Sequence, residues 1–432
     1  MVSASVSNSA VGRREVSTPL ALLVFVVALF FIWGGVTSLN DILIPKLKGL
    51  FALSYAQAML TQFAFFTAYA IVSLPAGVLV ARLGYGFGIA VGLGVMAGGC
   101  LLFIPAASSA AYPLFLAALF ILASGITILQ VAANPLIADL GPAETSHSRL
   151  TFAQAFNSLG TTIWPYVGAQ LILGSIAKVD PAKLSSEALA AFQAREAAVI
   201  GHTYLGIATA LVLVALPFLV WRRRLGEAEA GASLSGSLSL LGRPRLRFGV
   251  AAIFLYVGAE VAIGSLLVNY LMQQSVLGLA ERRAGELIAL YWGGAMVGRF
   301  LGAGLLRFVS PGKLLAGVAL GAVSLIALSA LSGGSVSGYS LLAVGLMNAI
   351  MFPTIFSLAL ERLGDRTAEG SGLLCMGIVG GALVPLLAGA VADATTLATA
   401  LAVPTLCYLY VAWFGWFARR PAAEVQDAPI LI

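Results

Sequence analysis

The sequence predicts an all-α integral membrane protein whose twelve transmembrane helices form two six-helix bundles. Of its 432 residues, 60% are hydrophobic and only 10% are charged, and the mean hydropathy is +0.99. This balance lies far outside that of a soluble domain. Apolar runs long enough to cross a bilayer recur along the whole chain, and a polar segment near the middle divides them into two sets of six.

A membrane-spanning helix needs about 20 mostly apolar residues, and twelve segments meet this requirement. They cover approximately 18–44, 54–80, 86–106, 112–138, 150–174, 199–221, 247–273, 284–307, 313–332, 337–360, 370–392 and 395–418. The first segment is longer than the apolar part of a signal peptide, and no small-residue cleavage site interrupts it. We therefore interpret it as a retained span.

The positions of the basic residues predict how the spans are oriented. If both termini lie in the cytoplasm, 17 of the 24 Lys and Arg residues fall on that side, Arg299 among them, as the positive-inside rule requires. The longest basic connection is rich in Gly and Ser between its ends, which suits a cytoplasmic linker. The predicted parts are a cytoplasmic tail (1–17), a bundle (18–221), the linker (222–246), a second bundle (247–418) and a second cytoplasmic tail (419–432).

The two halves also repeat one another weakly, as the halves of many transporters do. The matching positions are Gly77 and Arg82 with Gly302 and Arg307, Pro135 with Pro353, and Pro165 with Pro385. The run "GLGVMAGG" at 92–99 resembles a damaged dinucleotide-binding motif, but it lies inside an apolar span. Close packing of helices through small residues explains it better.

Two carboxylates lie within predicted spans, where a charge is costly and usually faces a cavity or a partner. Asp41 could be an interfacial residue paired with Lys46 or Lys48, or a carboxylate that takes up and releases a proton in a cavity. We favour the proton-coupling role for Asp41. Glu260 could pair with a distant basic residue such as Arg299, but a sugar hydroxyl or a coupling cation is the favoured partner.

The helix around Glu260 offers two further polar groups. Tyr256 precedes Glu260 by one turn and shares its face. Asn269 follows nine positions later and lies about half a turn out of phase. We expect Asn269 to join the site if Gly258 and Gly264 loosen the helix.

Uncharged polar residues form a second set of candidates inside the spans. Gln130 and Asn134 are spaced i, i+4, and Gln154 and Asn157 are spaced i, i+3, so each pair shares one helix face. Asn348 adds an amide in the tenth span. Each amide could simply bond neighbouring helices, but together with Trp33, Trp164 and Trp292 they suit a pocket for a neutral polyol or sugar. The candidate substrate contacts are Asn40, Gln130, Asn134, Gln154, Asn157, Glu260, Asn269, Trp292 and Asn348.

Several other classes of function are not expected. The net charge of +6 comes from basic residues scattered between apolar runs, which does not indicate nucleic-acid binding. There is no Walker sequence, so ATP is not expected to drive the protein. The Cys and His residues, which show no metal-site or disulfide spacing, are Cys100, Cys375, Cys407, His147 and His202. No cofactor or metal is expected.

Four stretches of sequence together resemble the fucose permease-like sugar symporters of the major facilitator superfamily. They are "SLNDILIP", "AANPLIADLGP", "FAQAFNSLG" and "FPTIFSLALERLG", and the resemblance covers about residues 20–418. The stretches "YVGAEVAIGSLLVNYL" and "YWGGAMVGRFLG" look most like the branch for glucose, galactose and N-acetylglucosamine. The resemblance implies the major facilitator fold, alternating access and secondary active uptake.

The resemblance also implies roles for particular residues. Asp41 matches the family's proton-linked carboxylate, and Gln154 and Asn157 match its sugar-contacting amides. The chain departs from fucose permease at two positions, because Gln130 replaces a carboxylate and Glu260 replaces a glutamine. This departure leaves sodium as an alternative coupling ion.

The sequence as a whole predicts a bacterial inner-membrane symporter and not an enzyme. It would import a neutral hexose or N-acetylhexosamine (glucose, galactose, mannose or N-acetylglucosamine) with protons through Asp41, as a monomer in the bilayer. Glu260 would bind the sugar and could share the coupling. The alternatives are sodium-coupled sugar symport, drug/proton efflux by the same architecture, and a sugar sensor that does not transport.

Overall fold

The computed structural model describes residues 20–51, 55–109, 111–168, 185–222, 225 and 232–420. Within these ranges, the side chains of 40–51, 55–59, 168, 186 and 188–198 are outside the description. The predicted N-terminal tail and almost all of the predicted C-terminal tail lie outside the described residues. All the regular elements of the described residues are helices, in agreement with the predicted all-α architecture.

Six long helices pack together to form the first bundle. They are α1 (Leu20–Phe51), α2 (Tyr55–Leu83), α3 (Tyr85–Ser108), α4 (Tyr112–Asp139), α5 (Ser146–Gly168) and α6 (Ser186–Trp221), with the short helix η1 (Ala143–Thr145) between α4 and α5. Within this bundle α3 packs on α4 and α6, while α1 packs on α5. Helix α1 continues past the predicted edge at residue 44, and α6 begins before the predicted residue 199.

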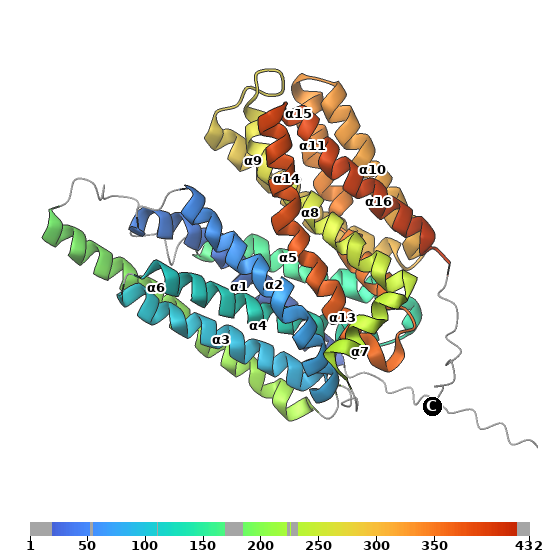
Figure 1. Cartoon of the computed structure of the whole chain (residues 1–432), viewed down its shortest axis with the longest axis horizontal. Coiled ribbons are helices and arrows are strands. Elements are labelled where there is room, and N and C mark those ends of the chain that lie inside the picture. Colours follow the sequence, from blue (N-terminus) through green and yellow to red (C-terminus); the bar gives the residue numbers. More distant parts are fainter. Residues whose placement is uncertain are drawn as a thin grey trace, which may run out of the picture.

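The remaining helices form the second bundle, after a connection that holds α7 (Leu234–Ser239) and η6 (Leu240–Gly242). They are α8 (Pro244–Met272), α9 (Glu281–Leu305), α10 (Pro311–Leu331), α11 (Gly334–Asn348), α12 (Met351–Leu360), η7 (Gly364–Arg366), α13 (Thr367–Met376), η8 (Gly377–Val379), α14 (Gly380–Ala394), α15 (Leu397–Ala400) and α16 (Ala402–Phe417). Figure 1 shows the two bundles as separate groups of helices that come together beside α7 and α13.

Ten helical stretches of the described residues are long and apolar enough to cross a membrane. The other two predicted spans correspond to α5 and α9, which have 23 and 25 residues and are long enough to cross the hydrocarbon layer of about 30 Å. Both are less apolar than the rest because they carry polar groups such as Gln154, Asn157 and Arg299. These two helices also pack against each other across the bundles.

The tenth predicted span is interrupted because of a proline. Helix α11 ends at Asn348 and α12 begins at Met351, and Pro353 follows at the third position of α12. A proline has no N–H to donate to the carbonyl four residues earlier, and its ring crowds that carbonyl. The carbonyl of Ala349 is therefore released from the helix and becomes available to a side chain.

Glycines allow the closest helix contacts. A Cβ on Gly92 or Gly99 would lie 2.9 Å or 2.6 Å from backbone nitrogens of α4, so the small residues at 92–99 pack helices together, as predicted. On α1 and α5, a Cβ on Gly34 would lie 2.1 Å from the carbonyl oxygen of Asn157, and one on Gly160 would lie 2.2 Å from that of Phe31. These two helices therefore approach each other backbone to backbone.

The bundles contact each other at the end of the molecule where η1, α7 and η7 lie, which we call the linker end. Ser148 Oγ donates to the Ala303 carbonyl at 2.6 Å, and His147 Nδ1 lies 2.6 Å from Ser357 Oγ. Ser371 Oγ donates at 2.8 Å to the Val131 carbonyl, which Pro135 releases in the same way as Pro353 releases that of Ala349.

The connection between the bundles is itself held at the linker end, a feature that the sequence analysis did not predict. Arg82 Nε donates to the Ala232 carbonyl at 2.8 Å. Ser237 of α7 donates to Glu369 Oε1 at 2.9 Å, and Arg366 bonds the other oxygen of this carboxylate at 2.7 Å. This charged network holds α7 against α13.

Contacts between the described parts of the bundles continue from the linker end to about the middle of the helices. Thr162 of α5 lies 3.7 Å from the sulfur of Met296 of α9, and Phe66 of α2 fills the space beside Gly381 of α14. Beyond Thr162 and Met296, Tyr166 and Trp292 are 73% and 44% exposed. The linker end is thus closed, and Figure 1 shows the two bundles farther apart at the opposite end.

The packing of α14 on α8 provides a test of this arrangement. A Cβ on Gly380 would lie 1.9 Å from the carbonyl oxygen of Phe254, so we expect Gly380→Ala to force the helices apart and to destabilise the protein by about 3 kcal/mol or more. Gly389 lies on the same helix with open space around it, so Gly389→Ala is the matched control. Thermal unfolding in detergent should show a lowered midpoint for Gly380→Ala only; equal midpoints would contradict the packing.

Candidate functional site

Three amides predicted to line the site come together in the first bundle. Gln154 Nε2 of α5 donates to Asn134 Oδ1 of α4 at 3.1 Å, and both side chains are buried. Among the described residues, Asn134 Nδ2 and Gln130 Oε1 are buried without a hydrogen-bond partner. The cluster therefore offers one free donor and one free acceptor from α4. We call Gln130, Asn134 and Gln154 the amide cluster.

Asn157 is placed differently from the other amides. Its Nδ2 donates at 3.1 Å to the carbonyl of Phe30, so this donor joins α5 to α1. The sequence "GG" at 34–35 makes the contact possible, because Gly34 leaves room for Asn157 and Gly35 leaves room for the ring of Trp164. Trp33 is buried on the same helix.

Asn40 and Asp41 lie within helix α1, but their side chains are outside the described residues. The same holds for the alternative partners Lys46 and Lys48. Immediately before them, Ser38 and Leu39 are buried. The choice between the two roles of Asp41 therefore stays a prediction.

Glu260 lies in a second cluster, formed by the second bundle. Tyr256 of α8 donates to the carbonyl of Asn348 at 3.2 Å, and Tyr291 of α9 donates to that of Glu260 at 3.1 Å. Asn348 Nδ2 donates in turn to the Tyr291 hydroxyl at 2.7 Å. Tyr408 of α16 lies beside Tyr291 and Asn348. We call these five residues the carboxylate cluster.

Two oxygen atoms of the carboxylate cluster lack a partner. Among the described side chains, Glu260 Oε1 and Asn348 Oδ1 are buried without a hydrogen-bond partner. A buried polar group without a partner is costly. A ligand with several hydroxyl groups could supply the missing bonds, because a hydroxyl both donates and accepts.

Arg299 connects the two clusters. Its Nε donates at 3.2 Å to the Ala349 carbonyl, which Pro353 releases. Its Nη1 reaches across to α5 of the first bundle, where it bonds Ser158 Oγ and lies 3.5 Å from the carbonyl oxygen of Gln154. Its charge also acts on Glu260, although the two groups do not form an ion pair within the part of the chain that the structure describes.

Two predicted site residues, Asn269 and Trp292, are not part of the carboxylate cluster. Helix α8 runs without interruption through Gly258 and Gly264, so it does not loosen as expected, and Asn269 stays exposed near its end. Trp292 packs edge-on against Tyr291, with ring centroids 5.1 Å apart, and 44% of it is exposed. Trp292 therefore borders the cluster, whereas Asn269 does not reach it.

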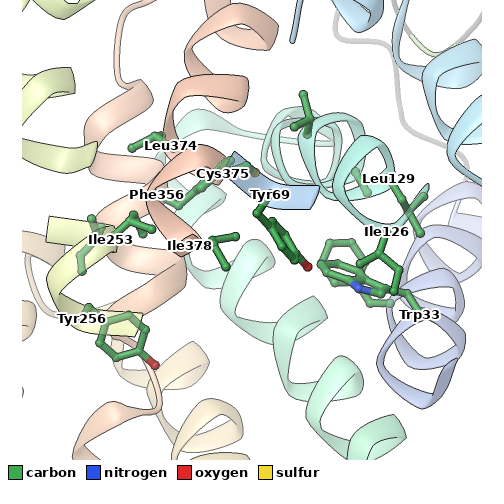
Figure 2. Packing of buried hydrophobic residues seen from close by; sticks show 14 of the residues in the cluster. Trp33, Tyr69, Ile126, Leu129, Ile253, Tyr256, Phe356, Leu374, Cys375 and Ile378 are labelled. Atoms are coloured by element: carbon green, nitrogen blue, oxygen red, sulfur yellow. The ribbon is translucent and has the colours of Figure 1, made fainter. Parts of the chain in front are cut away.

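An aromatic residue that the sequence analysis did not select lies between the bundles. Figure 2 shows the ring of Tyr69, from α2, between Ile378 of the second bundle and Trp33 of the first. Its side chain is only 3% exposed. No sequence motif pointed to Tyr69, because its place depends on how the two bundles meet.

The sequence analysis counted Arg299 among the basic residues of the cytoplasmic side and named it as a possible partner of Glu260, but it did not predict a contact between the bundles. In the structure Arg299 lies inside α9 and bonds both bundles. One signal was available, since Arg299 lies within the predicted span 284–307. A basic residue inside a span usually faces a partner or a cavity.

Comparisons with known proteins agree with this architecture. The family model described as Major Facilitator Superfamily matches residues 24–377. A protein of Brucella abortus biovar 1 (strain 9-941) named glucose/galactose transporter is 50% identical over 393 residues, which are 91% of this chain and 92% of that protein. The L-fucose-proton symporter of Escherichia coli (strain K12) is 38% identical over 435 residues, 97% of each chain.

The fold is also similar to that of a solved transporter. The crystal structure of FucP, a Major Facilitator Superfamily transporter in the outward conformation, superposes with a TM-score of 0.85 at 36% identity and covers 94% of this chain and 100% of that one. The predicted helical membrane fold and the predicted family are thus confirmed. The chain belongs to the Major Facilitator Superfamily and is a membrane transporter rather than an enzyme.

Proposed function

We propose that the protein is a secondary active symporter that imports a neutral hexose or N-acetylhexosamine together with protons by alternating access. The observation that carries the proposal is the similarity to a glucose/galactose transporter over 91% of the chain. The relative named L-fucose-proton symporter supports proton coupling. Glucose, galactose, mannose and N-acetylglucosamine are the candidate sugars.

The chemistry of the two clusters supports a sugar as the substrate. The amide cluster has a free donor on Asn134 and a free acceptor on Gln130, while Glu260 and Asn348 each have a free acceptor. A neutral sugar presents hydroxyl groups that can both donate and accept, so it can bond free donors and free acceptors alike. The rings of Tyr69 and Trp292 are available for the apolar face of the sugar ring.

Proton coupling is assigned to Asp41. Ser38 and Leu39 of α1 are buried, so a carboxylate at position 41 lies two residues beyond a buried part of the helix. Taking up a proton would neutralise it and allow the bundles to close around the bound sugar. One charge that crosses the whole field represents about 2.3 kcal/mol per 100 mV, enough to drive accumulation. Sodium coupling, with Glu260 taking part, is the alternative.

The orientation of the chain follows from its basic residues. We place the linker end in the cytoplasm of a bacterial cell, with the protein in the inner membrane as a monomer, because the Arg residues around the loops and the linker gather at that end. The closed linker end then corresponds to an outward-open state. The outward conformation of the similar FucP structure supports this assignment.

Uptake into proteoliposomes tests the function. We expect saturable uptake of labelled galactose or glucose when an inward pH gradient is applied, and little uptake without it. A sodium gradient in a separate series distinguishes the two coupling ions. Uptake driven by sodium alone would replace the proton assignment, efflux of lipophilic cations without any sugar flux would favour drug/proton exchange, and sugar binding without flux would favour a sensor.

Replacing the proposed proton carrier tests the coupling. Asp41→Asn removes the titrating group but keeps its size, so we expect it to abolish accumulation driven by a pH gradient while leaving counterflow of labelled sugar within about threefold of the unmodified protein. Asp393→Asn, an exposed residue at the end of α14, is the control and should accumulate sugar normally. Accumulation that survives in Asp41→Asn would contradict the assignment.

Shortening one amide tests the binding site. Gln154→Ala removes the group that bonds Asn134, so the amide cluster loses its arrangement, and we expect the sugar concentration for half-maximal counterflow to rise about tenfold, equivalent to about 1.4 kcal/mol. Gln274→Ala changes an exposed amide after α8 and is the matched control. Equal half-saturation in both variants would remove Gln154 from the sugar site.

A further inference from the structure

Arg299 uses its hydrogen bonds in a way that depends on the conformation of the protein. Its bond to the Ala349 carbonyl lies within its own bundle and survives any rigid movement of that bundle. Its contacts with Ser158 and Gln154 lie between α9 and α5 and can exist only while these helices are in contact. The present structure, with the linker end closed, is such a state.

Opening the linker end must break these inter-bundle contacts. Helices α5 and α9 also meet through Ser148 and Ala303, through the rings of Phe152, Phe156 and Phe300, and through Thr162 and Met296. When α5 and α9 part, Arg299 loses Ser158 and Gln154 as acceptors. A guanidinium inside a membrane protein then needs another partner.

Glu260 is suited to be that partner. It belongs to the same bundle as Arg299, so the two residues do not move apart when the bundles separate. Its Oε1 is buried without a hydrogen-bond partner in the described structure, and the charge of Arg299 already acts on it. A change in the conformation of the Arg299 side chain would bring the guanidinium and the carboxylate together without moving the helices of that bundle relative to one another.

We propose that Arg299 exchanges partners during transport: it bonds Ser158 and Gln154 when the linker end is closed, and the Glu260 carboxylate when the linker end is open. Arg299 is thus a positioning residue that links the state of Glu260 to the separation of α5 and α9. The role of sugar in this exchange rests on the proposed function. Because a sugar bound to Glu260 competes with Arg299, the Arg299–Glu260 bond forms when the protein is empty and returns to the state with a closed linker end.

Two variants test the exchange because they remove one partner each. Ser158→Ala removes a partner of the closed state, so it should shift the protein towards an open linker end. Glu260→Ala removes the partner of the open state and should shift the protein towards a closed linker end. Each shift should be about tenfold in the ratio of the two states, as expected for a lost hydrogen bond to a charged group. Both shifts should disappear in an Arg299→Gln background.

The ratio of states is read from the distance between two spin labels at the linker end. The labels are attached at Ala143→Cys, before α5, and Phe308→Cys, after α9, both of which are exposed, in a protein whose native cysteines are replaced by alanine. Ser148→Ala is the matched control: its bond to the Ala303 carbonyl joins the same two helices without involving Arg299. Its effect should persist unchanged in the Arg299→Gln background.

The outcomes separate this inference from the proposed function. Parallel shifts, absent shifts, or a Ser158→Ala shift that persists without Arg299 would overturn the exchange. Binding of labelled galactose or glucose is measured on the spin-labelled protein that keeps Ser158, Glu260 and Arg299. If neither sugar binds while the opposite shifts are seen, the exchange stands and the proposed substrate fails; if a sugar binds while the shifts are parallel or absent, the substrate stands and the exchange fails.

Discussion

The structure depends on one constraint of the bilayer: every backbone polar group at membrane depth must find a partner inside the protein. Prolines within helices break that rule locally, because each one releases the carbonyl four residues earlier. The Val131 carbonyl, released by Pro135, accepts from Ser371 of the other bundle. The Ala349 carbonyl, released by Pro353, accepts from Arg299. Two matching prolines of the two halves thus create the bonds that close the linker end and hold a charge at the site.

A second constraint concerns buried charge. A guanidinium and a carboxylate inside a membrane protein are both costly unless they are bonded. Arg299 satisfies this requirement through the Ala349 carbonyl and through α5, whereas Glu260 retains an oxygen without a partner. The helices that carry these polar groups, α5 and α9, are the two that fall short of the apolarity of a simple membrane span. The polar side chains of α5 and α9 thus lie in the two helices that join the bundles.

Much of the architecture was predictable because the signals are local. Hydropathy and length predicted most helix edges within a few residues of their observed positions. The i, i+4 spacing put Gln130 and Asn134 on one face of α4, and Asn134 bonds Gln154. The predictions were wrong where helices bend or continue. Glycines at 258 and 264 do not loosen α8, so Asn269 remains outside the carboxylate cluster. Pro353 interrupts the tenth span, which is divided between α11 and α12.

The sequence by itself determined that the chain is an all-α membrane protein and which helices carry polar groups, because hydrophobicity and helical periodicity are properties of neighbouring residues. Only the tertiary structure decided which of these groups meet. It brought Tyr291, Asn348 and Tyr408 around Glu260 from four helices, placed Tyr69 between the bundles, and placed Arg299 at the contact of α5 and α9. These contacts depend on how helices distant in the sequence pack, through glycines and released carbonyls, and no local sequence pattern predicts them.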